Sequence, residues 1–373
     1  MTAVALPATR GGERRESEHQ FAVPQYTLLA AHKQPMLLRS LNALTAHHRA
    51  ASPAYARMID ALFGDRGADA SDIASVPFLP VGVFKSHRLQ SIPDRDIATV
   101  LISSGTTGQT PSRIVLDHAT ATRQRAALAS IMGTLLGPRR LPMLVLDAPE
   151  IIRAKGPLTA RGAGVLGMMT FGGAHVFCLD DALTIQRDVL EQFLAKHGHA
   201  PFLIFGFTFL AWQALVEQLP AGSVDLANGT LVHSGGWKTL EARAVTDAVF
   251  RQRLSDATGL TRIHNFYGMV EQVGSVFLQG NDGLLYPPDF ADVLIRDPRS
   301  LEIVPHGTEG VIQVVSVLPH SYPGHSILTE DRGVIVHEDA PHSSRCGKGF
   351  RVLGRVPRAE LRGCSDVIAM GMQ

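Results

Sequence analysis

The sequence predicts an α/β protein built on a mostly parallel β-sheet that is layered with helices, followed by a smaller β-rich lobe. Three observations support this fold class. In the middle of the chain, short apolar runs alternate with amphipathic segments, as in a parallel sheet covered on both faces. The last third changes to short β-like runs separated by Pro/Gly turns. At 373 residues, 45% of them hydrophobic, the chain is long enough for one large domain or two ordinary ones.

The N-terminal region predicts a lead-in and then a helical layer. In residues 1–20 an apolar stretch too short for a signal peptide precedes a charged, polar run, so we expect this segment to be disordered. From Tyr26 to Phe63 apolar residues recur at spacings of three and four, which is typical of helices. Residues 76–93 run irregularly and are rich in Pro and apolar residues. We assign residues 21–268 to an α/β core that includes this helical layer.

The core is expected to alternate strand and helix from Ile97 onward. The expected strands are the runs IATVLI, PMLVLD, HVFCL, FLIFG, GTLVHS and RIHNF, and the expected helices lie near residues 119–136, 159–170, 185–197, 207–219 and 240–258. Residues 269–355 hold the runs VGSVFLQ, ADVLIR, GVIQVVSVL, GVIVHE and FRVLGR, which predict the antiparallel β-rich lobe. Residues 356–373 form a short C-terminal tail that carries Cys364.

Composition excludes several classes of function. Lys plus Arg (35) nearly balance Asp plus Glu (34), so no strong field points to nucleic acid or an anionic membrane. No apolar run reaches the ~18 residues of a membrane span. There is no HExxH motif and no tight His/Cys cluster, which argues against zinc. Three cysteines without a CxxC pair favour a reducing compartment, so we expect a cytoplasmic protein.

The stretch SSGTTG, residues 103–108, predicts a phosphate-binding loop. Glycines let successive N–H groups point into one concavity, hydroxyls add donors, and Arg113 could neutralise an anion. Ordinary turn chemistry can look the same. The stretch is not a Walker A loop, because Thr110, Pro111 and Ser112 stand where that motif requires glycine, lysine and a hydroxyl residue.

Three further corners follow predicted strands: GFTFLAW (206–212), HSGGWK (233–238) and YGMVEQ (267–272). Ligands of open α/β sheets bind beyond the carboxyl ends of the strands, so these corners should share a crevice with SSGTTG. The residue types suit a nucleotide and an apolar carboxylic acid. Thr106, Thr107 and Arg113 could hold phosphates, and Glu271 could hold Mg²⁺. Gly235 and Gly236 would admit a flat base, on which Tyr267 could stack. The aromatic residues Phe207, Phe209 and Trp212 could line an acid pocket, with core packing as the alternative for them.

Together with TEDRG (329–333) and LGRVPRAELRGCSD (353–366), these motifs resemble the LuxE-type acyl-protein synthetases, the fatty-acid-activating enzymes of bioluminescence, within the adenylate-forming superfamily. The resemblance runs from about Val76 to the end of the chain. It implies the large-domain fold of adenylate-forming enzymes, with ATP and Mg²⁺ as cofactors and the SSGTTG loop on the β- and γ-phosphates of ATP.

The resemblance also implies roles residue by residue. Ser104, Gly105, Thr106, Thr107 and Gly108 match the phosphate loop, with Arg113 near a position where the superfamily usually has lysine. Tyr267, Gly268 and Glu271 match the motif that contacts adenine and Mg²⁺, with Thr106 a second metal contact. Asp331 matches the aspartate that holds the ribose hydroxyls and Arg355 a nucleotide-contacting arginine. The expected acid-binding residues are Gly206, Phe207, Phe209, Trp212 and Trp237. Gly235 and Gly236 are expected beside them at the nucleotide.

One departure concerns the mobile C-terminal domain of the superfamily. That domain follows the GR hinge and its lysine reaches the reacting carboxylate, whereas this sequence ends at Gln373. LuxE-type proteins share this shortness. Lys238 and Arg113 are candidates for the missing positive charge, and Lys85 is a weaker one.

The implied reaction has two steps. ATP and a carboxylic acid would give an acyl adenylate and pyrophosphate, and a nucleophile would then take the acyl group. Cys364, with Arg355, Arg358 and Arg362 near it in sequence, is the expected thiol, or else a partner supplies a thiol or an amine. We expect an acyl-acceptor protein or a reductase as partner. The alternatives are an acyltransferase that uses no ATP and a non-catalytic nucleotide-binding scaffold subunit.

Overall fold

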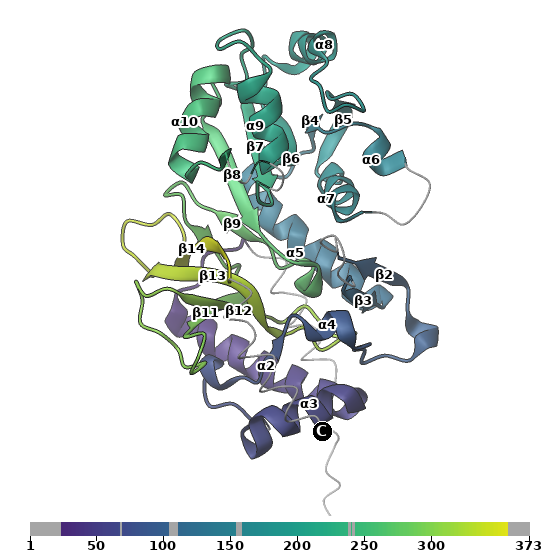
Figure 1. The fold of residues 1–373 in the computed structure, drawn as a ribbon, viewed down its shortest axis with the longest axis vertical. Coiled ribbons are helices and arrows are strands. Elements are labelled where there is room, and N and C mark those ends of the chain that lie inside the picture. Colours follow the sequence, from purple (N-terminus) through teal and green to yellow (C-terminus); the bar gives the residue numbers. More distant parts are fainter. Residues whose placement is uncertain are drawn as a thin grey trace, which may run out of the picture.

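The computed structural model describes residues 24–67, 69–103, 111–153, 159–237, 240 and 243–356. In these parts of the chain the predicted α/β fold is confirmed (Figure 1). The helices are α2 (Ala30–Ala51), α3 (Pro53–Phe63), α4 (Val83–Ser86), α5 (His118–Leu136), α6 (Glu150–Arg153), α7 (Ala160–Met169), α8 (Arg187–His197), α9 (Thr208–Trp212) and α10 (Asp247–Thr258). The strands are β1 (Leu79–Pro80), β2 (Thr99–Ile102), β3 (Arg113–Leu116), β4 (Leu141–Leu146), β5 (Gly172–Phe177), β6 (Phe202–Phe207), β7 (Gly229–Ser234), β8 (Arg262–Tyr267), β9 (Phe277–Gln279), β10 (Leu285–Tyr286), β11 (Ala291–Arg296), β12 (Gly310–Ser316), β13 (Ser326–Glu338) and β14 (Lys348–Arg355).

One sheet runs through the described chain in the order β11-β12-β13-β14-β10-β9-β8-β7-β6-β4-β5. Strands β5, β4, β6, β7 and β8 pair in parallel, as the alternation with helices predicted. From β8 through β9 to β11 the pairing is antiparallel. The sheet therefore continues across the boundary expected at residue 268, and the β-rich lobe extends the parallel sheet at its β8 edge.

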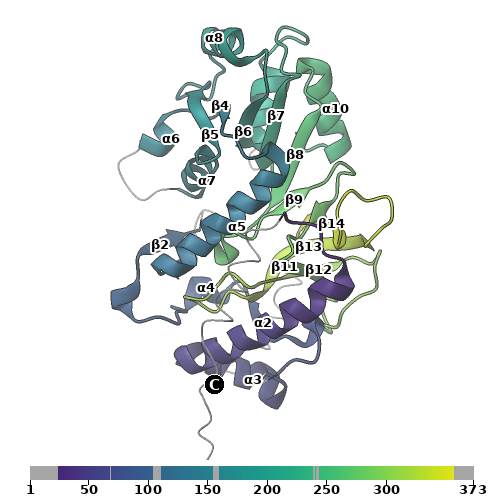
Figure 2. The same cartoon turned by 180° about the vertical axis from the view of Figure 1, so that it is seen from behind.

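Side-chain alternation gives the parallel sheet two apolar faces. On one face Val145, Phe205 and Val232 belong to the same buried cluster as residues of α5 and α7. On the other face Leu146 and Leu231, from β4 and β7, pack in a separate cluster with residues of α8, α9 and α10. Figures 1 and 2 show α5 running from beside β2 and β3 to the parallel part of the sheet.

Two expectations from the sequence need correction. The run IATVLI forms β2, which pairs with β3 in a separate two-stranded antiparallel sheet and is not a strand of the parallel sheet. Two short apolar runs that are near each other in sequence can pair as a hairpin, and periodicity alone does not distinguish such a pair from strands of the main sheet. The helix expected over residues 240–258 begins at Asp247, where the Thr246 side chain accepts from the backbone N–H of Val249 as N-cap.

The N-terminal helices cover the β-rich part of the sheet. The predicted helical region divides between α2 and α3 because Pro53 starts the second helix after the extended residue Ser52. His48 of α2 contacts the Ser91 hydroxyl through Nδ1 (2.7 Å) and the Pro319 carbonyl through Nε2 (3.1 Å). These bonds join the helical layer to the loop between β12 and β13.

Candidate active site

A cavity of about 800 Å³ lies beyond the carboxyl ends of β6, β7 and β8. Phe207 ends β6, Ser234 ends β7, and Tyr267 ends β8, and all three line this cavity. Ligands of open α/β sheets bind at this edge, and the volume lies in the range of small-molecule sites. The sequence-based expectation that strand-end corners share one crevice holds for these three residues.

The polar side of the cavity combines residues from β8, β13 and β14. The Tyr267 hydroxyl donates to Oδ2 of Asp331 at 2.7 Å, and Nε of Arg355 lies 3.9 Å from Oδ1 of the same carboxylate. Burial raises the pKa of Tyr267 well above its ordinary value, and the neighbouring carboxylate adds to that, so this hydroxyl stays protonated as the donor. Burial also raises the pKa of Asp331, against the opposing effects of the Tyr267 hydrogen bond and Arg355.

The Tyr267 ring is held by two neighbours. It stacks on Phe277 with ring centroids 6.0 Å apart and meets the Phe350 ring edge-on. Gly268, the next residue, also lines the cavity and is exposed. The ring is thus fixed between strands at the cavity edge.

Glu271 and Gln272 form a buried part of the cavity wall on the short 3₁₀ turn Val270–Gln272. Glu271 is only 5% exposed. The Gln272 amide donates through Nε2 to the carbonyls of Gly324 (3.0 Å) and Val314, and within the described chain its Oε1 is buried without a partner. That oxygen has no surface open to the cavity, so the charged group of this part of the wall is the Glu271 carboxylate, which suits a ligand with hydrogen-bond donors or a cation.

The cations of the cavity lie at its rim. Among its described lining residues, Lys85 and Arg355 carry positive charge, against Glu271, Glu330 and Asp331. Nζ of Lys85, on α4, lies 3.7 Å from Oε2 of Glu330. Of the three residues considered as the cation for the reacting carboxylate, Lys85 is the one that the described structure places in the cavity wall.

The opposite side of the cavity is apolar. Leu128 and Met132 of α5, Met168 of α7 and Leu101 of β2 line it together with Phe207. Gly164 and Gly167 of α7 also face it. The cavity therefore has a charged side and an apolar side, which fits a molecule with an anionic part and a hydrocarbon part.

A hydrogen-bond network fixes the corners after β6 and β7. The Thr208 hydroxyl donates to the Gly235 carbonyl at 2.7 Å, and Nδ1 of His233 lies 3.0 Å from the same hydroxyl. Because that hydroxyl has one proton, Nδ1–H of His233 is the donor to it. Burial lowers the pKa of His233 to about 3, so the ring is neutral. Gly235 has φ of 80°, where glycine is favoured.

The structure does not bring the other predicted acid-binding residues to the cavity. Phe209 is buried in the cluster on the opposite face of the sheet. Trp212 packs edge-on against Trp237, with centroids 5.3 Å apart, and both rings contact Phe250 of α10. Gly206 fits against Leu146 so closely that an added Cβ would lie 2.7 Å from the Leu146 Cβ.

Three further predicted residues, Gly235, Gly236 and Arg113, lie outside the cavity lining. Gly236 is exposed, and a Cβ there would meet nothing within 4 Å. Arg113 is exposed on β3, paired in register with Ile102, which does line the cavity. The neighbouring Ser103 lines the cavity and its N–H donates to the Ser112 carbonyl at 3.0 Å.

Seven predicted residues fall outside the described parts of the chain. They are Ser104, Gly105, Thr106, Thr107 and Gly108 of the loop, Lys238, and Cys364. The other two cysteines are described. Cys178 is fully buried, which raises the pKa of its thiol to about 12, and burial also raises the pKa of the Cys346 thiol. Neither is an activated thiolate.

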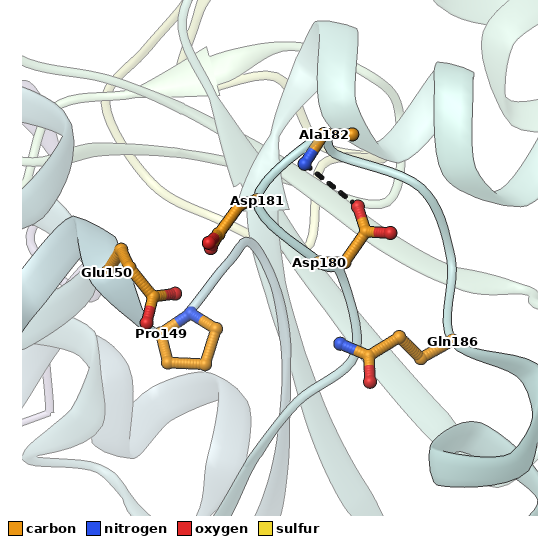
Figure 3. Close-up of a pocket in the computed structure, with 6 residues that line it drawn as sticks. All are labelled: Pro149, Glu150, Asp180, Asp181, Ala182 and Gln186. Carbon is orange, nitrogen blue, oxygen red and sulfur yellow. Dashed lines mark hydrogen bonds between the residues drawn. The ribbon is translucent and has the colours of Figure 1, made fainter.

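A second pocket, of about 430 Å³, lies between the Pro149 corner and the loop before α8. Figure 3 shows Asp180 hydrogen-bonded to the N–H of Ala182 in its own loop. The lining of this second pocket includes Glu150 and Asp181 and, among the described residues, no lysine or arginine. An anionic nucleotide does not suit this pocket.

Sequence reasoning missed the apolar wall. The segment ARGAGVLGMM of α7 contains Gly162, Gly164 and Gly167, and glycine inside a helix is unfavourable. That unusual glycine content was the available signal. Glu330 was also missed, although it adjoins Asp331 in TEDRG.

Comparisons with known proteins identify the relatives of this chain. The family model described as acyl-protein synthetase, LuxE, matches residues 25–372. Among curated proteins, the chain is 23% identical over 315 residues to a long-chain-fatty-acid–luciferin-component ligase of Aliivibrio fischeri, covering 81% of this chain and 80% of that protein. It is 20% identical to the protein of the same name from Vibrio harveyi, covering 80% and 79%.

Among solved structures, a 2-hydroxyisobutyryl-CoA ligase in an open conformation with 2-HIB-AMP and CoA gives a TM-score of 0.64 at 18% identity, covering 89% of this chain and 77% of that one. The same ligase in a thioesterification state also gives 0.64, at 17% identity. These likenesses confirm the adenylate-forming fold that the motifs implied. With a family match that spans almost the whole chain, this protein belongs to the LuxE acyl-protein synthetase family and is an enzyme of the ligase class.

Proposed function

We propose that the protein activates an apolar carboxylic acid with ATP, releasing pyrophosphate and forming an acyl adenylate, and then transfers the acyl group to a thiol or an amine with release of AMP. The observation that carries the proposal is the single cavity in which Tyr267, Glu271, Asp331 and Arg355 meet an apolar wall. These four residues come from motifs separated by up to 88 positions in the chain, and each was expected at the nucleotide.

In the proposed complex the nucleotide lies along the polar side. Asp331 accepts from ribose hydroxyls, the Tyr267 ring packs on adenine, and Arg355 and Lys85 offset the charge of the phosphates and of the acid's carboxylate. A substrate pair this anionic needs cations, and these two are the ones that the described cavity wall supplies. The loop 104–108 is expected to hold the β- and γ-phosphates, because Ser103 at its start lines the cavity.

Glu271 fits the expected magnesium ion. Within the described residues no group of three His, Cys, Asp or Glu side chains forms a metal site, so a dedicated protein cage is not the arrangement present there. Mg²⁺ is commonly held by one or two carboxylates together with substrate phosphates, and Glu271 is a buried carboxylate in the wall beside the nucleotide residues. When bound, the ion would neutralise phosphate charge.

The acid's carboxylate oxygen would attack the α-phosphorus, forming the carboxylate–phosphorus bond as the bond to pyrophosphate breaks. The apolar wall would hold the acyl chain and exclude water from the mixed anhydride. Lys85 and Arg355 would orient the attacking carboxylate against the α-phosphate and stabilise the charge that develops there.

Cys364 is the proposed acyl acceptor within this chain, with a partner protein's thiol as the other possibility. The N–H of Val356 donates to the Glu330 carbonyl at 2.9 Å, so the chain is anchored at the cavity rim there. Cys364 follows eight residues later, and eight residues span at most about 28 Å. The thiol is therefore within chain reach of the cavity.

The test is incubation of the purified protein with ATP, Mg²⁺ and carboxylic acids from benzoate to tetradecanoate. We expect acid-dependent pyrophosphate release and, by intact-protein mass spectrometry, an acyl adduct that the Cys364→Ser variant lacks. Pyrophosphate without any adduct would place the acceptor on a partner. An adduct formed from an acyl-CoA without ATP would replace the proposal with an acyltransferase.

A further inference from the structure

The apolar wall of the cavity contains an unexplained feature on α7. Gly164 and Gly167 both line the cavity from the interior of this helix, where each glycine costs about 1 kcal/mol relative to alanine. Neither has a positive φ that would require glycine. The reason for these residues is therefore not the backbone conformation of the helix.

Close packing does not explain Gly167 either. A Cβ added at Gly167 would meet no atom within 4 Å, so it would project into open space. A Cβ added at Gly164 would lie 3.3 Å from Cζ of Phe207, another residue of the apolar side. The two positions therefore differ: Gly167 borders empty volume, whereas Gly164 borders the Phe207 ring, which lines the same volume.

The surroundings of this volume identify its occupant. Met132 of α5 and Met168 of α7 are buried beside it, and thioether side chains adapt to apolar groups of different shape. At the other side of the same cavity lie the charged side chains of Glu271, Asp331 and Arg355. A molecule that spans both sides has a polar head and a hydrocarbon part.

We propose that the α7 face bearing Gly164 and Gly167 is the wall that selects the acyl chain of the acid, with Gly167 setting the length accepted. The inference rests on the proposed function and moves the acid from the tryptophan corner to the space between α5, α7 and Phe207. The substrate class is an acid with an extended aliphatic chain, because the wall offers apolar contacts and, among its described residues there, no polar group that would pair with a substituent.

The variant that tests this is Gly167→Leu. Leucine favours the helix and its side chain would enter the cavity, so the fold should be kept while the chain subsite is shortened. Gly133→Leu is the matched control, because Gly133 is an exposed glycine inside α5 whose added Cβ also meets nothing within 4 Å. Thermal unfolding of both variants checks that each is folded.

Two readouts separate this inference from the proposed function. Equilibrium dialysis with radiolabelled hexanoate, decanoate and tetradecanoate measures acid binding without turnover. Pyrophosphate release with the same acids and ATP measures activation. In Gly167→Leu we expect tetradecanoate binding, and its kcat/KM, to fall about tenfold or more while hexanoate is little changed. ATP KM should be unchanged, and Gly133→Leu should behave as wild type.

The outcomes are distinguishable. If Gly167→Leu leaves the chain-length preference unchanged in both readouts, or if wild type binds none of the three acids, the inference is overturned. If wild type binds the acids and loses long-chain binding in Gly167→Leu but releases no pyrophosphate, the acyl subsite stands and the proposed activation fails. A loss for every acid alike, with the protein folded, would also contradict the length-setting role.

Discussion

The two faces of the parallel sheet carry side chains of the same kind but differ in what they enclose. Behind the sheet, Trp212, Trp237 and Phe250 contact one another over α9 and α10, and Phe250 is 2% exposed. In front, Phe207 and the glycines of α7 leave a cavity of about 800 Å³. The difference teaches that aromatic residues near a strand end identify a core as readily as a binding pocket. On the open face, the facing helix α7 presents Gly164 and Gly167 to the cavity.

The largest expected effect concerns the closed face of the sheet, the face on which Phe250 packs with Trp212 and Trp237. Phe250→Ala should lower the free energy of unfolding by about 3–5 kcal/mol, because it leaves a cavity in a well-packed core. Phe207 lies on the open face of the sheet, the face that borders the cavity. Phe207→Ala should lower the free energy of unfolding by less than about 2 kcal/mol and should instead alter acid preference. Chemical denaturation and the acid panel measure both. Equal losses of stability would break the distinction between the faces.

The next effect concerns the polar side of the open face. Glu271→Gln keeps the shape of the side chain and removes its charge, so pyrophosphate release should fall a hundredfold or more, about 3 kcal/mol, with no loss of thermal stability. Raised Mg²⁺ should restore part of the rate. The surface variant Glu309→Gln is the control and should match wild type. Full activity of Glu271→Gln would remove this residue from the proposed site.

Asp331→Asn should have a smaller effect, confined to the nucleotide. Removal of a charged acceptor should raise ATP KM about tenfold to a hundredfold, corresponding to about 1.5–3 kcal/mol, while the chain-length preference stays as in wild type. Steady-state kinetics at varied ATP measures the change. A shift in acid preference with unchanged ATP KM would mean that the two sides of the cavity have been assigned the wrong way round.

The smallest effect is a pH dependence on the closed face. His233 is neutral in the fold, with its pKa lowered to about 3 by burial and then by Arg251 and His264, whereas the unfolded value is 6.5. Between these values only the unfolded chain takes up the proton, so stability is present above pH 6.5 and is lost as pH falls toward 3. His320 and His325, also lowered to about 3, add to this slope.

His233→Asn isolates that contribution. The asparagine amide can still donate to Thr208 but does not titrate, so the slope of unfolding free energy below about pH 6 should flatten by up to about 1.4 kcal/mol per pH unit. Chemical denaturation between about pH 7 and 5 measures it, with the exposed His199→Asn as control. An unchanged slope would show that this ring is not the buried neutral base inferred from its contacts.

The sequence by itself determined most of the secondary structure and grouped four residues that line the cavity. Apolar periodicity predicted β7 and β11 at their observed bounds, because strand and helix periods are local properties of the chain. The motifs predicted Tyr267, Glu271, Asp331 and Arg355 as one site, and these residues line one cavity. No helix within the described ranges has the length and apolarity needed to cross a bilayer.

Tertiary structure alone decided which residues border the cavity. The segment GFTFLAW reads as one aromatic unit, but strand alternation turns Phe207 to the cavity, while the next residue begins α9, which packs Phe209 on the opposite face. The partnership of Tyr267 with Asp331, 64 residues apart, likewise depends on sheet order. Local periodicity fixes which residues share a face of one element. Only the packing of elements decides which face is filled and which stays open.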